Sequence, residues 1–310
     1  MRVVVALLAL MACEGGGTDS DDTDVPGETD PADDTDPADD TDVPDDTDPV
    51  DTDPGETDLP NEATAVVGTS CPVDHLLGSV EIGGDGVISL NGEVYDRQHP
   101  WYGPPTESTS TCDFHQHGVA SCGPCASGTI CGVSGQCEPE PHRLKDVWVE
   151  LASGVQTQTV QADAVTGQLY GEVTIGDGSA YSLRLGWGDV EITVPELTMP
   201  TAPFDGEVTI EGDYDAPGAL AAAWTARSDG AFVGTKVNIN HHAAGPTFTV
   251  CQAPGDAGAF AATATMMDPL AVSTGLEFQG IDVHQIASAW VVGGCVEVRM
   301  GKRHYVQPNP

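Results

Sequence analysis

Val147-Trp148-Val149-Glu150-Leu151 and Val190-Glu191-Ile192-Thr193-Val194 alternate apolar and polar residues, and this period of two decides the fold. Successive side chains of a β-strand point to opposite faces of a sheet, so each stretch buries one face and exposes the other. The same pattern recurs in Val80–Ile82, Val173–Ile175, Leu183–Leu185, Val208–Ile210, Val237–Ile239, Phe248–Val250, Leu276–Phe278 and Val296–Val298. The sequence therefore predicts a mainly β protein with short antiparallel strands.

Turn-forming residues separate these stretches. Asp85-Gly86, Asp177-Gly178 and Asp229-Gly230 lie between strand-like runs, where glycine accepts the positive φ that a tight hairpin requires. Proline and glycine recur too often for long helices, and only Ala219–Ala223 and Met266–Val272 have helical potential. Many short strands at this spacing are typical of antiparallel β-sandwiches.

In the C-terminal part, residues 197–306, Trp224 lies within Ala-Ala-Trp-Thr-Ala. The strand-like runs that follow it are Val237–Asn240, Phe248–Cys251 and Val296–Met300. This pattern resembles a fibronectin-III or immunoglobulin-like sandwich, and the resemblance implies that Trp224 is the core tryptophan. The resemblance implies a sandwich with its own hydrophobic core.

The first thirteen residues have the composition of an export signal. Arg2 provides a positive charge, and the apolar run Val3–Met11 is much shorter than the roughly 20 residues of a membrane-spanning helix. The run ends in Leu10-Met11-Ala12-Cys13, which resembles the lipobox of bacterial lipoproteins. The resemblance implies cleavage before Cys13 and lipidation of its thiol and amine, with palmitate-type chains anchoring the protein to a membrane. The alternative is an ordinary signal peptide in which Cys13 is incidental.

An acidic repeat follows Cys13. Thr-Asp recurs at five- or six-residue intervals, and residues 14–62 contain 21 Asp or Glu and no Lys or Arg. Such a segment cannot bury enough apolar surface to offset its chain entropy. The sequence therefore predicts a disordered tether over residues 13–63, and this tether lacks the ligand pattern of an EF-hand calcium loop.

The remaining body is also acidic. Without the 21 acids of the tether and without Arg2, 28 acidic and 9 basic residues remain, a net charge of 9 − 28 = −19. Nucleic acids and anionic lipid surfaces require clustered Lys and Arg, and only Lys302-Arg303-His304 forms such a cluster here. We therefore expect no nucleic-acid partner.

Eight further cysteines, an even number in an exported chain, predict disulfides. They are Cys71, Cys112, Cys122, Cys125, Cys131, Cys137, Cys251 and Cys295. The run from Cys122 to Cys137, of the form C-x2-C-x-x-G-x-x-C-x5-C, resembles small cysteine-rich inserts in surface proteins of large-genome Gram-negative bacteria. Since five cysteines fall within residues 112–137, one must pair outside the cluster. Cys71 is the nearest candidate partner, and Cys251 is expected to pair with Cys295.

Metal binding is the alternative for part of this region. Cys122 and Cys125 have the spacing of zinc ligands, and Cys131 with Cys137 or His117 could complete the set. An oxidising compartment favours disulfides instead. His115 and His117, at positions i and i+2, are weak candidates for a metal site. In an extended segment both rings face the same side, where they could bind one metal ion together.

No catalytic motif is present, and neither catalytic residues nor a cofactor are predicted. The sequence lacks the serine-hydrolase, zinc-protease, P-loop and dinucleotide-binding motifs. A glycosidase carboxylate pair cannot be identified from sequence, because its two members are neighbours only in space. The aromatic residues able to stack on sugars, or to pack in a core, are Trp101, Tyr102, Trp187 and Trp290.

These features predict four parts: a signal peptide at 1–12, the tether at 13–63, a β-rich region at 64–195 that contains the cysteine-rich module, and a β-sandwich at 196–310. The expected protein is a lipoprotein of the cell envelope, in the outer membrane and facing the periplasm or the cell surface. Its expected role is binding, adhesion or envelope structure, with protein or carbohydrate as partner. The alternative is an exported metal-dependent enzyme with a histidine-rich site.

Overall fold

The computed structural model describes nine stretches of the chain. They are residues 61–84, 87–116, 122–175, 180–200, 208–212, 217–239, 247–271, 276–278 and 280–304. Residues 1–60, which include the predicted signal peptide, Cys13 and most of the predicted tether, lie outside these stretches. The first strand begins at Glu62, so the end of the predicted tether belongs to a sheet.

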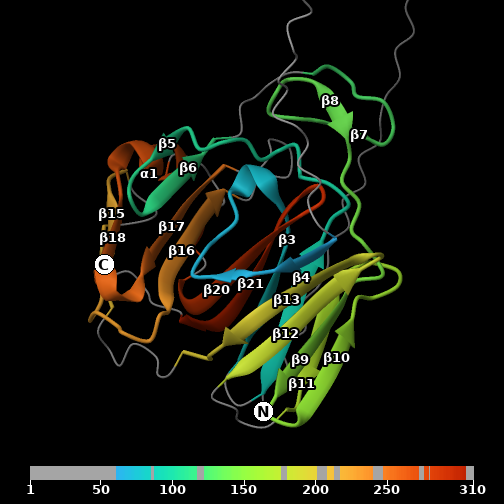
Figure 1. Ribbon diagram of the computed structural model, residues 1–310. Helices are drawn as coiled ribbons and strands as arrows, with labels where there is room; N and C mark the ends of the chain where they lie inside the picture. Colours follow the sequence, from blue (N-terminus) through green and yellow to red (C-terminus); the bar gives the residue numbers. More distant parts are fainter. Residues whose placement is uncertain are drawn as a thin grey trace, which may run out of the picture. The chain divides into compact units, whose positions relative to one another are not determined.

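An 11-stranded sheet is the centre of the fold (Figure 1). Its strands, in spatial order, are β11 (Leu169–Val173), β4 (Ile88–Val94), β3 (Leu76–Gly83), β21 (Gly294–His304), β20 (Ile281–Val291), β16 (Phe232–Ile239), β17 (Phe248–Pro254), β6 (Cys112–His115) and β5 (Glu107–Ser108). The strands β2 (Val66–Val67) and β19 (Leu276–Phe278) pair with β20 and β16. Only β3 and β21 run parallel to each other in this sheet.

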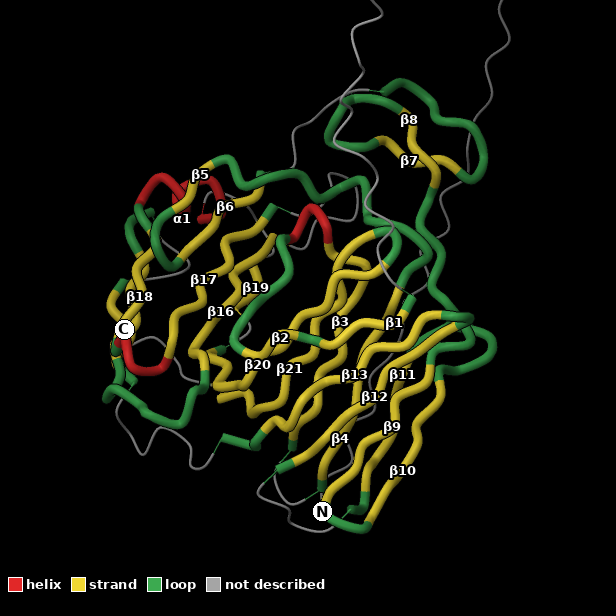
Figure 2. Tube along the Cα trace, viewed as in Figure 1, coloured by secondary structure: helices red, strands yellow, loops and turns green. Residues whose placement is uncertain are grey.

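Three smaller sheets complete the described structure (Figure 2). The five-stranded sheet contains β1 (Glu62–Thr64), β13 (Val190–Leu197), β12 (Tyr181–Trp187), β9 (Trp148–Ser153) and β10 (Gln156–Gln161). The three-stranded sheet contains β14 (Thr209–Glu211), β15 (Leu220–Ala223) and β18 (Ala259–Ala262). The hairpin in the cysteine-rich module is β7 (Thr129–Cys131) with β8 (Cys137–Pro139).

The helices are short. They are the 3-10 turns η1 (Val73–His75) and η2 (Gly255–Ala257) and the helix α1 (Ala264–Ala271). In the described part of the chain, no helix has the length and apolar character needed to cross a membrane.

The five-stranded sheet packs on one half of the large sheet. Alternate residues of its strands, such as Leu185 and Ile192, meet Val80 of β3 and Val298 of β21 in one hydrophobic core. All four side chains are at most 1% exposed. Burial of apolar surface from both sheets stabilises this sandwich.

The three-stranded sheet packs on the other half and forms a second core. Leu220 of β15 and Phe260 of β18 meet Val233 of β16, and Met266 of α1 joins them. Trp224 also lies in this core, as predicted, and its ring N–H donates to the carbonyl oxygen of Gly255 at 2.7 Å. The structure is thus mainly β and sandwich-like.

Both cores use the same face of the large sheet. On β20, Ile281 belongs to the second core and Ala287 to the first, and these odd-numbered positions share one face of the strand. The opposite face, here called the cleft face, is largely polar. Strand alternation and register assign to it Glu81, Asp113, His115, Lys236, Phe248, Gln252, Asp282, His284, Glu297 and Arg299.

The large sheet crosses the predicted boundary between residues 195 and 196. It combines β3, β4, β6 and β11 with the C-terminal β16, β17, β20 and β21. Residues 196–310 therefore do not form a self-contained sandwich, because β6 supplies Cys112 and Phe114 to the second core and β21 pairs with β3.

One turn and one helix differ from expectation. The strands on either side of Asp229-Gly230 belong to different sheets, so this pair does not close a hairpin, although Gly230 has the expected positive φ of 70°. Asp85-Gly86 and Asp177-Gly178 lie outside the described residues. Ala219–Ala223 contains strand β15 rather than a helix, because pairing with β14 and β18 on both edges outweighs the helix propensity of alanine. The other helix candidate, Met266–Val272, overlaps α1.

The eight body cysteines form four disulfides. The pairs are Cys71–Cys295, Cys112–Cys251, Cys122–Cys131 and Cys125–Cys137. The predicted pairing of Cys251 with Cys295 is wrong, and so is the pairing of Cys71 with the cluster. Cys112 lies directly opposite Cys251 in the β6–β17 ladder, and the segment before β3 brings Cys71 to the start of β21.

Candidate functional site

A cleft lies on the cleft face, beside the segment that precedes β3. Two adjoining cavities of about 210 and 400 Å³ form it, and Gln252, Glu297 and Arg299 line both. Residues 70–74 line the larger cavity, and Tyr102 lines the smaller one. The Cys71–Cys295 disulfide fastens the segment 70–74 to β21.

A buried ion pair lies between these cavities. The Nε of Arg299 donates to Oε1 of Glu297 at 2.5 Å, and the backbone N–H of Cys71 donates to Oε2 of Glu297 at 3.0 Å. The Glu297 side chain is only 4% exposed. Burial opposes the charge of Arg299, but the carboxylate of Glu297 raises the pKa of Arg299 above its ordinary value. The pair thus joins β21 to the segment 70–74.

Lys236 of β16 enters the smaller cavity. Its Nζ lies 4.3 Å from the centre of the Phe248 ring. Burial lowers the pKa of Lys236, and the positive charge of Arg299 lowers it further, whereas Glu81 raises it. Among the described residues, Lys236 forms no ion pair.

Two buried histidines also face the cleft. Both ring nitrogens of His284 and Nε2 of His115 have no hydrogen-bond partner among the described residues. Nδ1 of His115 lies 3.1 Å from the carbonyl oxygen of Gly103, and its ring stacks on Phe248 with centroids 4.7 Å apart. Burial, with a smaller effect of Arg299, lowers the pKa of His284 to about 3. Burial also lowers the pKa of His115, so both rings are neutral at neutral pH.

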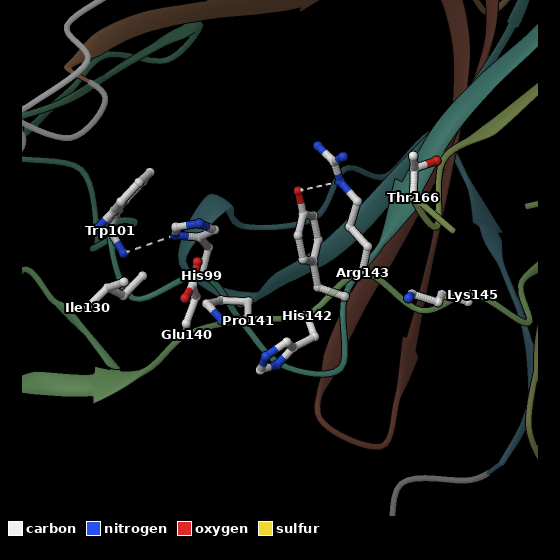
Figure 3. A pocket seen from close by; sticks show the side chains of 10 residues that line it. His99, Trp101, Ile130, Glu140, Pro141, His142, Arg143, Lys145 and Thr166 are labelled. Carbon is white, nitrogen blue, oxygen red and sulfur yellow. Dashed lines mark hydrogen bonds between the residues drawn. The ribbon is translucent and has the colours of Figure 1, made fainter. Parts of the chain in front are cut away.

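A second site, the Trp101 pocket, has a volume of about 380 Å³ (Figure 3). Its lining residues are Tyr95, His99, Trp101, Ile130, Glu140, Pro141, His142, Arg143, Lys145 and Thr166. Trp101 is 37% exposed, and its ring centroid lies 4.4 Å from that of His99. Burial lowers the pKa of His99, so this ring is neutral at neutral pH. The pocket combines an exposed aromatic ring with hydrogen-bonding and charged side chains.

Three chain segments hold the Trp101 pocket. Tyr95, at the end of β4, forms an antiparallel bridge with Arg143, whose Nε donates to the Tyr95 hydroxyl at 3.2 Å. The backbone N–H of Tyr102 donates to the carbonyl of His99 at 3.0 Å, which closes the turn that carries Trp101. The N–H of Val133 donates to the carbonyl of Pro100 at 2.9 Å and joins the cysteine-rich module to this turn.

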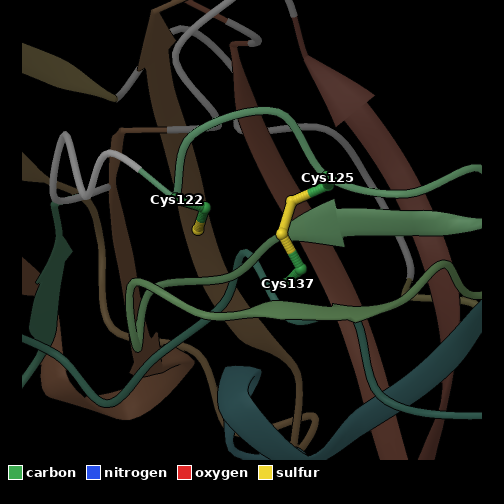
Figure 4. A group of neighbouring side chains, drawn as sticks. All are labelled: Cys122, Cys125 and Cys137. Carbon is green, nitrogen blue, oxygen red and sulfur yellow. A yellow bond between two sulfur atoms is a disulfide. The ribbon is translucent and has the colours of Figure 1, made fainter. Parts of the chain in front are cut away.

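The cysteine-rich module contains closely spaced sulfur atoms. The Sγ atoms of Cys122, Cys125 and Cys137 lie within 4.8 Å of one another (Figure 4). All three are bonded in disulfides, with Cys131 as the fourth member. A sulfur in a disulfide is no thiolate, so these atoms do not offer the zinc ligands considered from the sequence.

The predicted histidine pair is only partly described. His115 lies on the cleft face, and His117 lies outside the described residues. In the described part of the chain, the cysteines above form the one group of three or more close candidate ligands, and His115 does not belong to it. The metal site at His115 and His117 stays a prediction.

Comparisons with known proteins add no assignment. The sequence matches no protein-family model and no curated protein. Among solved structures, the chain is similar to the FN1–FN3 domains of chicken CNTN1, at 8% identity over 70% of this chain and 75% of that chain. The TM-score is 0.15, and a likeness at that level carries no argument about this protein.

Sequence reasoning identified Trp101 and His115 as informative residues, but missed Lys236, His284 and Arg299. Each of these three is one polar residue in an alternating strand, where the pattern indicates a solvent-facing position. A signal was present for Lys236, because the whole chain contains only three lysines and this one directly precedes the strand-like run Val237–Asn240.

Proposed function

We propose that this protein is a lipid-anchored binding protein of the cell envelope, which holds a short saccharide in the Trp101 pocket. The observation that carries the binding role is the exposed Trp101 ring in an open pocket of about 380 Å³. Small-ligand sites are concave and combine apolar surface with a few polar groups. A sugar ring has an apolar face suited to the indole and hydroxyl groups suited to a polar rim.

The polar rim supports a saccharide in particular. Nδ1 of neutral His99 accepts the backbone N–H of Trp101 at 3.5 Å, which leaves its Nε2–H as a donor for a ligand. Lys145 is exposed and provides further donors, and Glu140 provides acceptors. Hydroxyl groups both donate and accept hydrogen bonds, so this mixed set suits them better than it suits a simple anion. The acidic body, with its net charge of −19, also disfavours anions (28 acidic and 9 basic residues after position 62).

Replacing Trp101 by alanine is expected to weaken saccharide binding at least about tenfold, since stacking on the indole is lost. A glycan array identifies the ligand, and isothermal titration calorimetry measures its affinity for both proteins. Tyr170→Ala is the matched control, because Tyr170 is an aromatic residue that is 69% exposed on β11 and does not line the pocket. Equal loss in both variants, or no glycan bound by the parent protein, would contradict the proposal.

The anchor rests on the sequence Leu10-Met11-Ala12-Cys13 and the acidic repeat behind it. Serine offers no thiol for acylation, so Cys13→Ser is expected to leave the precursor uncleaved or to move the protein out of the lipoprotein fraction. Membrane fractionation and metabolic labelling with palmitate measure this. Normal processing and unchanged membrane association of the variant would show that Cys13 is not the anchor.

A further inference from the structure

Lys236 lies in an unusual setting for a charged side chain. It projects from the middle of β16 into a cavity of about 210 Å³, with Phe248 on one side. The ammonium forms no ion pair among the described residues, although Lys and Arg in protein interiors are usually paired. Its environment therefore provides little of the compensation that a buried positive charge requires.

The charged groups around this cavity are Glu81 of β3, Asp282 of β20, and Glu297 and Arg299 of β21. Glu297 is already hydrogen-bonded to Arg299 and to the backbone of Cys71. Burial and Arg299 favour the neutral amine of Lys236, while Glu81 and the Phe248 ring favour the ammonium. Burial has the largest effect on the pKa of Lys236, and it lowers that pKa. A desolvated lysine beside another cation is a common setting for a nucleophilic amine.

We propose that Lys236 is a nucleophile that captures small aldehydes or ketones in this cavity as an imine. The Nζ lone pair attacks the carbonyl carbon, and a proton passes from nitrogen to the carbonyl oxygen to give a carbinolamine. Loss of water then forms the C=N bond, so one water is released and nothing is oxidised or reduced. The unpartnered ring of His284, which lines the same cavity, provides one donor and one acceptor to the carbinolamine oxygen and its proton.

The cavity has room for a small carbonyl compound. A space of about 210 Å³ admits a short aliphatic aldehyde. This site is separate from the Trp101 pocket, since the two share no lining residue. The imine proposal and the saccharide proposal can therefore fail independently.

The three lysines of the chain make a direct test possible. The full chain is incubated with acetaldehyde and cyanoborohydride at pH 7.5, and peptide mapping follows N-ethylation at Lys236 and at the exposed Lys145. We expect Lys236 to react faster than Lys145, because burial lowers the pKa of Lys236 and leaves more of its amine unprotonated at pH 7.5.

A lysine variant provides the control. Lys236→Met should remove the fast reaction and leave the rate at Lys145 unchanged, with thermal unfolding reporting on the fold. Labelling of Lys236 no faster than that of Lys145 at pH 7.5 would overturn the proposal.

Discussion

Replacing Cys112 and Cys251 together by alanine is expected to lower the free energy of unfolding by about 5 kcal/mol. The two residues are 139 positions apart, so their disulfide removes much conformational entropy from the unfolded chain. Both side chains are at most 2% exposed in the second core, and the lost sulfur atoms also leave a cavity. Urea denaturation of the parent and the variant, followed by tryptophan fluorescence, measures the difference.

The Cys122–Cys131 disulfide provides a matched control. Its cysteines are only 9 positions apart, so the same entropy model gives a loss of about 3 kcal/mol for Cys122→Ala with Cys131→Ala. This loss should be confined mainly to the cysteine-rich hairpin, which lies outside both hydrophobic cores. If the two double variants lost equal stability, or if peptide mapping found a Cys251–Cys295 link, the assigned role of Cys112–Cys251 would be wrong.

The disulfide partners of Cys251 and Cys295 could not be predicted from the sequence, for a physical reason. Proximity along the chain favours Cys251 with Cys295, a short loop within the C-terminal part. In the fold, β6 pairs with β17 across a large sequence separation, and this pairing places Cys112 opposite Cys251. Strand order is decided by packing of whole sheets, and a strand's own residues do not encode it.

The strands themselves were predictable, because alternation is local. Val190–Val194 lies within β13, and its Ile192 and Val194 are at most 1% exposed, as the pattern requires. Ala219–Ala223 was misjudged because alanine favours helices in isolation, whereas here Leu220 and Ala222 fill the second core from a central strand. Local alternation thus predicts the strands, whereas tertiary packing determines that Ala219–Ala223 contains a strand and not a helix.

The cleft could not be predicted in the same way. Lys236, His284 and Arg299 meet only because β16, β20 and β21 are neighbours in the sheet. From the sequence, each is a polar residue with at least one apolar neighbour in a strand-like run, which is typical of a solvated face. The segment 70–74, which the Cys71–Cys295 disulfide joins to β21, lines this part of the cleft face. No local sequence pattern predicts that this segment lies there.

Glu297→Gln is expected to destabilise the fold by about 3 kcal/mol, because the variant leaves Arg299 without its counter-ion in a largely buried setting. Glutamine keeps an oxygen that can accept the hydrogen bond from the backbone of Cys71, but its NH2 group then faces Nε of Arg299. The variant therefore removes the charge together with the hydrogen bond from Arg299. The matched control is Glu191→Gln, which removes one of the two carboxylate partners of Arg184 on the solvent side of β12 and β13 and leaves Glu150. The side chains of Arg184 and Glu191 are 47% and 38% exposed, so this change should cost much less stability than Glu297→Gln.

A second variant separates the ion pair from simple packing. Removing both charges with Glu297→Leu and Arg299→Met avoids leaving either one unpaired, so much of the stability lost in Glu297→Gln should return. Urea denaturation of the three proteins and the parent gives the comparison. If Glu297→Gln were no more harmful than Glu191→Gln, Arg299 would not depend on Glu297. If the double variant were less stable than Glu297→Gln, the guanidinium of Arg299 would stabilise the fold by contacts beyond the ion pair.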